Sequence, residues 1–241
     1  MDDLQLAAKV HYSFLPKDYE DGRISIAVTL CPLFPIGGDY CSINPLNEDL
    51  ILLCMCDALG HGTPAALFAA RINTYVLTHA KAGVKPCEIV SGLNSYLCKR
   101  LSGAGMYATF FAVLLDLKQG SMSFAGAAHP PVLHLQKDQT SCHECPSIVS
   151  LLGMMDPMPL FCATEQVQLK SGDRILLYSD GLIEVEDANQ RPFGIEGLAK
   201  SLLAHRDLSG QDFNKSILNQ AKSFGKRGFQ DDVLLLSAVI K

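Results

Sequence analysis

Charged residues are scarce in this sequence, and neither sign is in large excess. They account for 19% of the 241 residues, whereas hydrophobic residues account for 48%. Disordered chains have the opposite balance, so the composition excludes a mainly disordered protein and predicts a folded one with a sizeable core. The formal net charge of −5 also argues against nucleic acid or an anionic membrane surface as the main partner.

Segments for membrane insertion or export are absent as well. No stretch reaches the roughly 18 consecutive apolar residues of a membrane helix, because serine and glycine interrupt the best candidate, residues 101–115. The chain begins Met1-Asp2-Asp3, whereas a secretory signal would be basic there. Nine cysteines in a chain without such a signal predict reduced thiols and a cytoplasmic location.

Several common catalytic patterns are missing too. Gly37-Gly38 is not followed by Lys and Ser or Thr, so a nucleotide-binding phosphate loop is not supported. No Cys–His or Ser–His–Asp nucleophile arrangement is recognisable. The segment Cys142-His143-Glu144-Cys145 has the spacing of zinc ligands, but no second cysteine pair follows it. A surface loop is therefore the preferred interpretation of that segment.

Hydrophobic periodicity and turn residues predict one domain in which helices cover the strands of two sheets. A short amphipathic pattern predicts a helix over residues 4–15. Short connections predict antiparallel pairing among strands 107–116, 121–126 and 132–136, a hairpin of 166–170 with 173–178, and a surface loop over 137–147. The remaining expected strands are 23–30, 50–56 and 233–240, and the remaining expected helices are 65–80, 87–101, 195–204 and 213–224.

Four aspartates stand beside glycine or at the ends of expected strands: Asp39, Asp57, Asp180 and Asp231. Each of them taken alone is an ordinary turn residue. Three of them, however, adjoin strongly apolar strands, so folding would carry their carboxylates to the rim of a buried core. Carboxylates gathered there repel one another unless cations lie between them. Oxygen ligands suit Mg²⁺ or Mn²⁺ better than zinc or copper, so these residues predict a site for a hard divalent metal.

Short motifs that include these aspartates follow one another along most of the chain. They are Gly37-Gly38-Asp39-Tyr40, Asp57-Ala58-Leu59-Gly60-His61-Gly62 with Ala65-Ala66-Leu67, Tyr107-Ala108-Thr109-Phe110, Ala127-Ala128-His129-Pro130-Pro131, Ser179-Asp180-Gly181-Leu182, Phe193-Gly194 and Gln230-Asp231-Asp232-Val233. In order and separation, from about Leu15 to Lys241, the motifs resemble the PPM-type metal-dependent serine/threonine protein phosphatases. The resemblance is to their bacterial SpoIIE-type branch, which regulates sigma factors.

The resemblance implies an α+β fold, an αββα sandwich of two face-to-face antiparallel β-sheets flanked by helices. It places the phosphatase domain at residues 16–241 and makes residues 1–15 an N-terminal linker or dimerisation helix. The implied reaction is direct attack of a metal-bound hydroxide on phosphoserine or phosphothreonine, without a phosphoenzyme. The implied substrate is a phosphorylated STAS-type anti-anti-sigma regulator in a partner-switching pathway.

The resemblance also assigns ligands for two Mn²⁺ or Mg²⁺ ions. Asp57 is implied to bridge both ions, and the main-chain carbonyl of Ala58 to be an additional ligand. Asp180 and Asp231 are implied to bind the first ion, and Asp39 the second. Asp57 is the first predicted catalytic residue. Because no arginine lies between Arg23 and Arg71, the phosphate-binding arginine of the eukaryotic relatives is absent, and the metal ions would supply most of the charge stabilisation.

Roles other than metal binding are predicted for further residues of the motifs. His61 is the second predicted catalytic residue, a proton donor to the leaving serine oxygen, although it could instead fix the turn between Gly60 and Gly62. His129 is expected to be structural, and Asp232 to support the neighbouring ligands. Two alanines, Ala58 and Ala128, stand where relatives more often have glycine.

Two other classes of function stay open at this point. A module that binds a phosphoprotein without catalysis would usually have lost a metal-ligating aspartate, and all four are present. A hydrolase of small phosphate esters would share the same metal site. In SpoIIE-type relatives the leading segment joins an upstream sensory or receiver domain to the catalytic core. We therefore expect homodimerisation through the first helix to act on a switch formed by helices 64–80 and 86–101.

Overall fold

The computed structural model describes residues 3–101, 103, 105–159 and 166–241, and it divides into two compact units. Each unit is built on its own antiparallel sheet. The first unit comprises Met1–Pro16, Phe34–His129 and Pro146–Gln168, and the second comprises Lys17–Leu33, Pro130–Cys145 and Leu169–Lys241. Both units are therefore assembled from separated segments of the chain.

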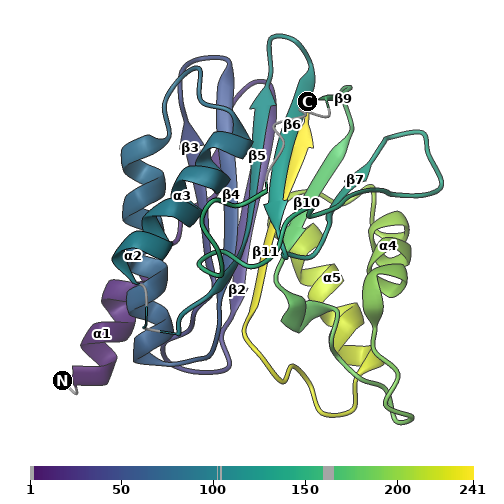
Figure 1. Ribbon diagram of the computed structural model, residues 1–241. Coiled ribbons are helices and arrows are strands. Elements are labelled where there is room, and N and C mark those ends of the chain that lie inside the picture. The colour runs from purple at the N-terminus through teal and green to yellow at the C-terminus, as the bar shows by residue number, and fades with distance from the viewer. Residues whose placement is uncertain (1–2, 102, 104, 160–165) are drawn as a thin grey trace. The chain divides into compact units, whose positions relative to one another are not determined.

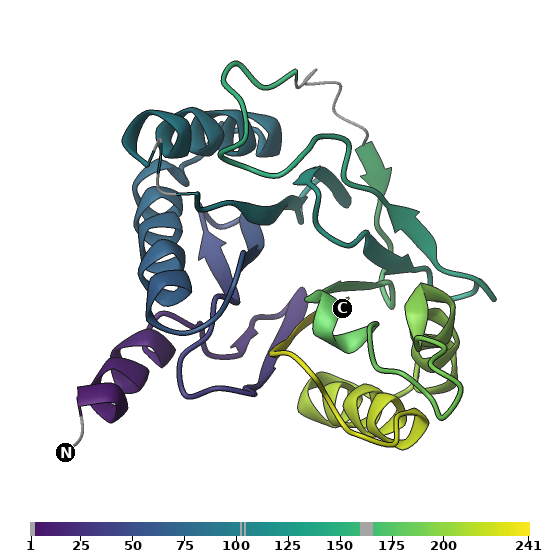
Figure 2. The ribbon, with the colours of Figure 1, turned by 60° about the horizontal axis from the view of Figure 1, so that its bottom comes forward.

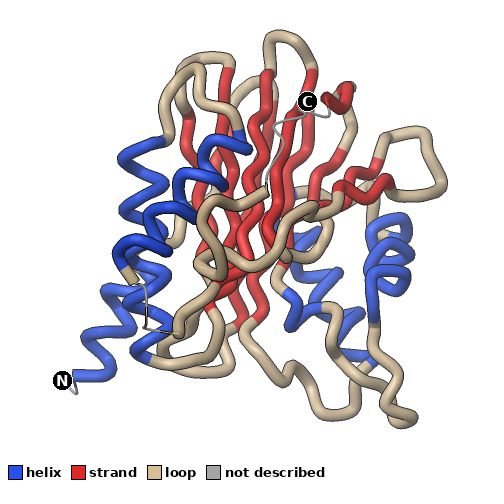
Figure 3. The backbone as a smooth tube through the Cα atoms, in the orientation of Figure 1, coloured by secondary structure: helices blue, strands red, loops and turns tan. Residues whose placement is uncertain are grey.

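The first unit contains a five-stranded sheet in the order β3-β4-β5-β6-β9. Helices α2 (Thr63–His79) and α3 (Pro86–Arg100) lie side by side along one face of this sheet (Figures 1 and 3). A further helix, α1 (Asp3–Tyr12), opens the chain. The strands are β3 (Tyr40–Pro45), β4 (Leu50–Ala58), β5 (Ala108–Asp116), β6 (Ser121–Ala127) and β9 (Gln166–Gln168).

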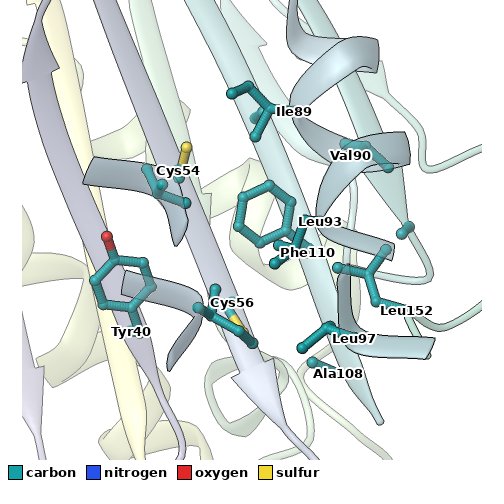
Figure 4. Close-up of a cluster of buried hydrophobic side chains, with 14 of the residues drawn as sticks. Tyr40, Cys54, Cys56, Ile89, Val90, Leu93, Leu97, Ala108, Phe110 and Leu152 are labelled. Carbon is teal, nitrogen blue, oxygen red and sulfur yellow. The ribbon is translucent and has the colours of Figure 1, made fainter. Parts of the chain in front are cut away.

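The core of the first unit follows from the apolar sequence of β4. Residues 51–56 of this strand are fully buried on both faces, as a continuous apolar run predicts. Cys54 and Cys56 lie in one cluster with Phe110 of β5 and Leu93 of α3 (Figure 4). They behave as small apolar side chains, and burial raises the pKa of the Cys54 thiol to about 12.

The second unit contains a six-stranded sheet in the order β1-β2-β11-β10-β7-β8. Helices α4 (Gly194–Ala204) and α5 (Gly210–Phe224) lie side by side (Figure 2) and pack on this sheet through buried residues such as Phe213 and Ile217. A short 3₁₀ helix, η1 (Asp180–Leu182), follows β10. The strands are β1 (Tyr19–Glu20), β2 (Ile24–Cys31), β7 (Val132–Leu135), β8 (His143–Cys145), β10 (Arg174–Tyr178) and β11 (Val233–Ile240).

Three predicted strand arrangements are wrong. The expected hairpin of 166–170 with 173–178 does not form, because β9 pairs with β6 and β10 pairs with β7 and β11. The strand expected over 132–136 leaves the sheet of its predecessor, since Pro130 and Pro131 lack the N–H groups that a ladder needs. The expected loop over 137–147 includes β8, which pairs with β7.

Two further expectations concern the cysteines and the membrane. Seven cysteines of the described chain are free, as predicted. Cys87, by contrast, is disulfide-bonded, so the prediction of reduced thiols fails at that position. None of the helices within the described ranges combines the length and apolarity that crossing a membrane requires.

Candidate metal centre

Asp39 and Asp57 stand at the same end of the first sheet. Antiparallel pairing matches Tyr40 of β3 with Cys56 of β4, so one further step along the register brings Asp39 opposite Asp57. Asp39 is only 6% exposed, and Asp57 is half-buried. Burial, followed by the charges of Asp57 and Asp39, holds the pKa of the Cys56 thiol well above its ordinary value. The two carboxylates therefore form a close pair beside the core.

The loop before β3 presses against the main chain after Asp57. A Cβ atom on Gly38 would lie 2.8 Å from the carbonyl oxygen of Ala58 and 3.2 Å from the Cβ of Ala65. Only glycine fits here without a shift of the backbone, which explains the glycine next to Asp39. The Ala58 carbonyl, one of the predicted ligands, thus belongs to the same small assembly as the pair of aspartates.

His61 lies in the turn that joins β4 to α2. Gly60 and Gly62 on either side have φ values of +91° and +75°, which favour glycine. The imidazole is exposed and stacks on the ring of Phe34, with the centroids 4.9 Å apart and the planes 19° apart. This contact suits the alternative in which His61 fixes the turn, and its role as a proton donor stays a prediction.

Asp180 and Asp231 form a second pair, in the second unit. Asp180 opens η1 after β10, and Asp231 precedes β11, the strand that pairs with β10. Ser179 joins the two segments, because its N–H donates to Leu234 O (3.0 Å) and its Oγ accepts the Leu234 N–H (2.9 Å). A Cβ on Gly181 would collide with the carbonyl oxygen of Asp232, so glycine is needed at this crossing.

The second pair is electrostatically crowded. Burial, and then the charge of Asp231, raise the pKa of the Asp180 carboxyl above its ordinary value, although backbone hydrogen bonds partly oppose the rise. Burial, and then the charges of the same two aspartates, raise the pKa of Glu184. Asp232 instead accepts the N–H of Leu33 at 2.6 Å and so anchors the chain after β2.

The structure thus groups the four predicted aspartates as two pairs, one in each unit. Within the ranges that the structure describes, no set of three acidic, histidine or cysteine side chains is close enough to form a metal site on its own. The donors nevertheless fit Mg²⁺ or Mn²⁺, because they are hard oxygens and because burial and then the charge of Asp231 raise the pKa of Asp180, a cost of ionisation that a bound cation would offset.

Sequence reasoning missed two features beside these pairs. Glu184 lies four residues after Asp180, one helical turn away, and this spacing could have revealed it. A groove of about 590 Å³ runs from Asp231 and Gly181 past Glu184 to Arg227. The segments that line this groove are up to fifty residues apart in the sequence, between Gly181 and Asp231, so only the folded structure could show it.

Comparison with known proteins identifies the lineage of the chain. The family model described as Stage II sporulation protein E (SpoIIE) matches residues 47–241. The phosphoserine phosphatase RsbU of Bacillus subtilis is 24% identical over 238 residues, which are 97% of this chain and 69% of RsbU. The phosphoserine phosphatase RsbP of Bacillus subtilis is 21% identical over 185 residues, 76% of this chain but only 45% of RsbP.

Solved structures agree on the fold. The SiaA PP2C domain of Pseudomonas aeruginosa superposes with a TM-score of 0.82 at 20% identity, covering 100% of this chain and 96% of that one. The PP2C phosphatase domain of SpoIIE from Bacillus subtilis gives a TM-score of 0.73 at 18% identity, covering 93% of this chain and 64% of that one. The predicted α+β phosphatase fold is confirmed, and the chain belongs to the SpoIIE family.

Proposed function

We propose that this chain is a metal-dependent protein phosphatase that hydrolyses phosphoserine or phosphothreonine. The observation that carries the proposal is the retention of all four strand-end aspartates in a chain that matches the SpoIIE family over residues 47–241. Asp39 is buried, Asp57 and Asp180 are half-buried and Asp231 is exposed, and cations bound between the members of each pair would offset their mutual repulsion. Burial, and then the charge of Asp231, raise the pKa of Asp180, so repulsion within the second pair contributes to this rise.

Each aspartate has a distinct place in the proposed site. As the family resemblance implies, Asp57 would bridge both ions, with the carbonyl of Ala58 as an additional ligand, while Asp180 and Asp231 would bind the first ion and Asp39 the second. Two Mg²⁺ or Mn²⁺ ions, when bound, would clamp the phosphoryl group and lower the pKa of a water molecule. Gly38 and Gly181 allow the close backbone contacts that orient these ligands.

The groove beside Asp231 is the proposed seat of the substrate residues that flank the phosphoserine. Glu184 and Glu186 line it together with the exposed Arg227. Arg227 therefore offers a positive charge next to a ligand, in a chain that lacks an arginine between Arg23 and Arg71. As substrate we propose a phosphorylated STAS-type regulator in the cytoplasm, because the family resemblance implies it and two relatives are named phosphoserine phosphatases.

The test of the proposed function is release of phosphate from a phosphoserine STAS protein. We expect release with Mn²⁺ or Mg²⁺, none with EDTA, and a loss of at least about a thousandfold for Asp57→Asn. The matched control is Asp207→Asn, which changes an exposed aspartate in the turn after α4. Hydrolysis of p-nitrophenyl phosphate but of no phosphoprotein would favour the small-ester hydrolase. A folded protein that binds the substrate without turnover would favour the binding module.

Regulation by a second copy of the chain is the remaining part of the proposal. Helix α1 exposes Leu6 (54%) and Val10 (51%), and Leu67 of α2 is 64% exposed. These side chains line one apolar groove of about 400 Å³ between α1 and α2. A homodimer would cover this surface, and α2 follows the short turn after β4, the strand that contains Asp57.

The dimer is tested by size and turnover together. We expect Leu6→Glu to convert a dimer into a monomer in light scattering and to lower turnover. The control, Leu77→Glu, changes an equally exposed leucine near the other end of α2. A variant that stays dimeric with full turnover would contradict this part. The relatives RsbU and RsbP are longer than the matched region, so an upstream sensory or receiver domain also remains a proposal.

A further inference from the structure

Two motifs of the sequence contain none of the proposed metal ligands, yet the structure joins them beneath Asp57. These are Tyr107-Ala108-Thr109-Phe110, on β5, and Ala127-Ala128-His129-Pro130-Pro131, after β6. Thr109 is paired directly with Asp57 in the β4–β5 register. Side chains opposite one another on antiparallel strands share a face of the sheet, so the threonine hydroxyl and the Asp57 carboxylate leave the sheet on the same side.

Hydrogen bonds connect Asp57, Thr109 and His129 in a row. The N–H of Asp57 donates to Thr109 Oγ1 at 3.2 Å, and the same oxygen lies 2.8 Å from Nδ1 of His129. When the imidazole carries its hydrogen on Nε2, Nδ1 accepts the threonine O–H, and donors and acceptors match along the row. The hydroxyl also lies 3.5 Å from the carbonyl oxygen of Asp57. Thr109 therefore holds the peptide group of Asp57 from the neighbouring strand.

His129 is itself firmly fixed. It is 4% exposed, and its ring lies 6.4 Å from the ring of Phe111. Its N–H donates to Ser147 Oγ at 3.0 Å, and the Ser147 hydroxyl donates back to its carbonyl at 2.8 Å. The imidazole is thus held by its main chain and by ring packing, and it can serve as a rigid support for Thr109.

Backbone strain next to His129 supports a specific role for this position. Ala128 has a φ of 49°, a conformation that costs an alanine about 1–2 kcal/mol. Such strain persists only where the surroundings impose it, and it concentrates at functional sites. Here the Ala128 N–H donates to Val149 O at 2.8 Å. The backbone conformation of Ala128 therefore sets the position of His129 relative to Thr109.

We propose that Thr109 and His129 are positioning residues that hold the main chain at Asp57, and thereby aim its carboxylate for metal binding. The inference rests on the proposed function, since it concerns the ligand that would bridge the ions. Asp57 needs such a hold because β4 ends one residue later and gives way to a turn with positive φ at Gly60 and Gly62. Residues that orient metal ligands in this way typically contribute 10–100-fold to metal affinity.

The experiment compares Mn²⁺ affinity by isothermal titration calorimetry, without turnover, in wild type, Thr109→Val, Thr109→Ser and His129→Asn. We expect Thr109→Val, which keeps the shape but loses the hydroxyl, to weaken Mn²⁺ binding about tenfold. Thr109→Ser keeps the hydroxyl and should bind within about twofold of wild type. His129→Asn places an amide near Nδ1 and should weaken binding less than Thr109→Val does. The control is Thr29→Val, because the Thr29 hydroxyl bonds instead to Gln211, at 2.8 Å.

Kinetics and stability complete the test. At saturating Mn²⁺ we expect the KM for p-nitrophenyl phosphate to be unchanged in Thr109→Val, because the row touches the ligand and not the substrate. Thermal unfolding checks that each variant is folded. If Thr109→Val does not fold, the Mn²⁺ affinities of Thr109→Ser and His129→Asn are compared instead, and equal affinities would overturn the inference. A folded Thr109→Val with wild-type Mn²⁺ affinity would overturn the inference. Failure of wild type to bind Mn²⁺ or to release phosphate would instead overturn the proposed function.

Discussion

Ala128 is the residue at which local conformation and sequence disagree most. Its φ of 49° suits glycine, the residue that the family resemblance leads one to expect there. We predict that Ala128→Gly raises the free energy of unfolding by about 1 kcal/mol, because relief of the strain exceeds the entropy lost by the more flexible glycine. The measurement is guanidinium chloride unfolding. Ala127→Gly is the control, and it should destabilise, since Ala127 is a buried strand residue without a positive φ.

Asp180 gives a second prediction at the scale of single residues, this time with a pH dependence. Burial and Asp231 raise its pKa in the folded protein, so ionisation of Asp180 costs stability as the pH rises through the ordinary aspartate range, and the loss persists at neutral pH. In EDTA at neutral pH we therefore expect Asp180→Asn to unfold at a higher temperature than wild type. The difference should vanish as the pH falls below the raised pKa, where Asp180 becomes neutral.

Mn²⁺ should reverse the order of the unfolding temperatures, so that wild type becomes more stable than Asp180→Asn. The ion relieves the repulsion in wild type, whereas the asparagine variant has lost a ligand and gains no stability from the metal. Differential scanning calorimetry in EDTA and in Mn²⁺, at neutral and at acidic pH, checks both signs. An asparagine variant that is less stable than wild type in EDTA would contradict the electrostatic interpretation of this pair.

At the scale of elements, a buried aspartate holds one end of the second sheet together. Asp173 is 1% exposed and accepts hydrogen bonds from His134 Nε2 on β7 and from the N–H groups of Lys137 and Lys170, each at 3.0 Å. Asp173→Ala would leave three donors without this acceptor. We predict a loss of about 3–5 kcal/mol in the free energy of unfolding, measured by denaturant titration. Asp207→Ala, at an exposed site, should change it by less than about 0.5 kcal/mol.

The same elements show what local sequence can predict. The helices and most of the long strands were predicted with boundaries close to those observed, because apolar periodicity and the flanking proline and glycine residues are local signals. The six-residue strand β3 was not predicted. The pairing partners of the short strands were not predicted. The turn at Ser171-Gly172 suits a hairpin as well as it suits a passage from β9 in one sheet to β10 in the other, and only long-range packing distinguishes the two.

At the scale of the whole molecule, the candidate site also combines features that local sequence predicts with features that only long-range packing determines. The four aspartates were singled out because they stand beside glycine or at strand ends and belong to motifs of the family, and their role as ligands stays a prediction. The strand register adds that Asp39 lies opposite Asp57. The row of Asp57, Thr109 and His129 was not predicted, because its members are up to seventy-two residues apart, between Asp57 and His129, and nothing in their spacing indicates contact. Long-range hydrogen bonds leave no periodic signal in a sequence.

The proposed ligands come from segments that are far apart in the sequence, since Asp39 and Asp57 belong to the β3–β4 region and Asp180 and Asp231 to the β10–β11 region. A metal that needs both pairs would link its binding to the folding of the whole chain. We therefore predict that Mn²⁺ at a hundredfold excess over its Kd raises the free energy of unfolding by about 2.7 kcal/mol relative to EDTA. Asp39→Asn and Asp231→Asn should each remove most of this gain. Guanidinium chloride titrations with and without Mn²⁺ measure it, and a gain that survives Asp231→Asn but not Asp39→Asn would show that the first unit binds the metal alone.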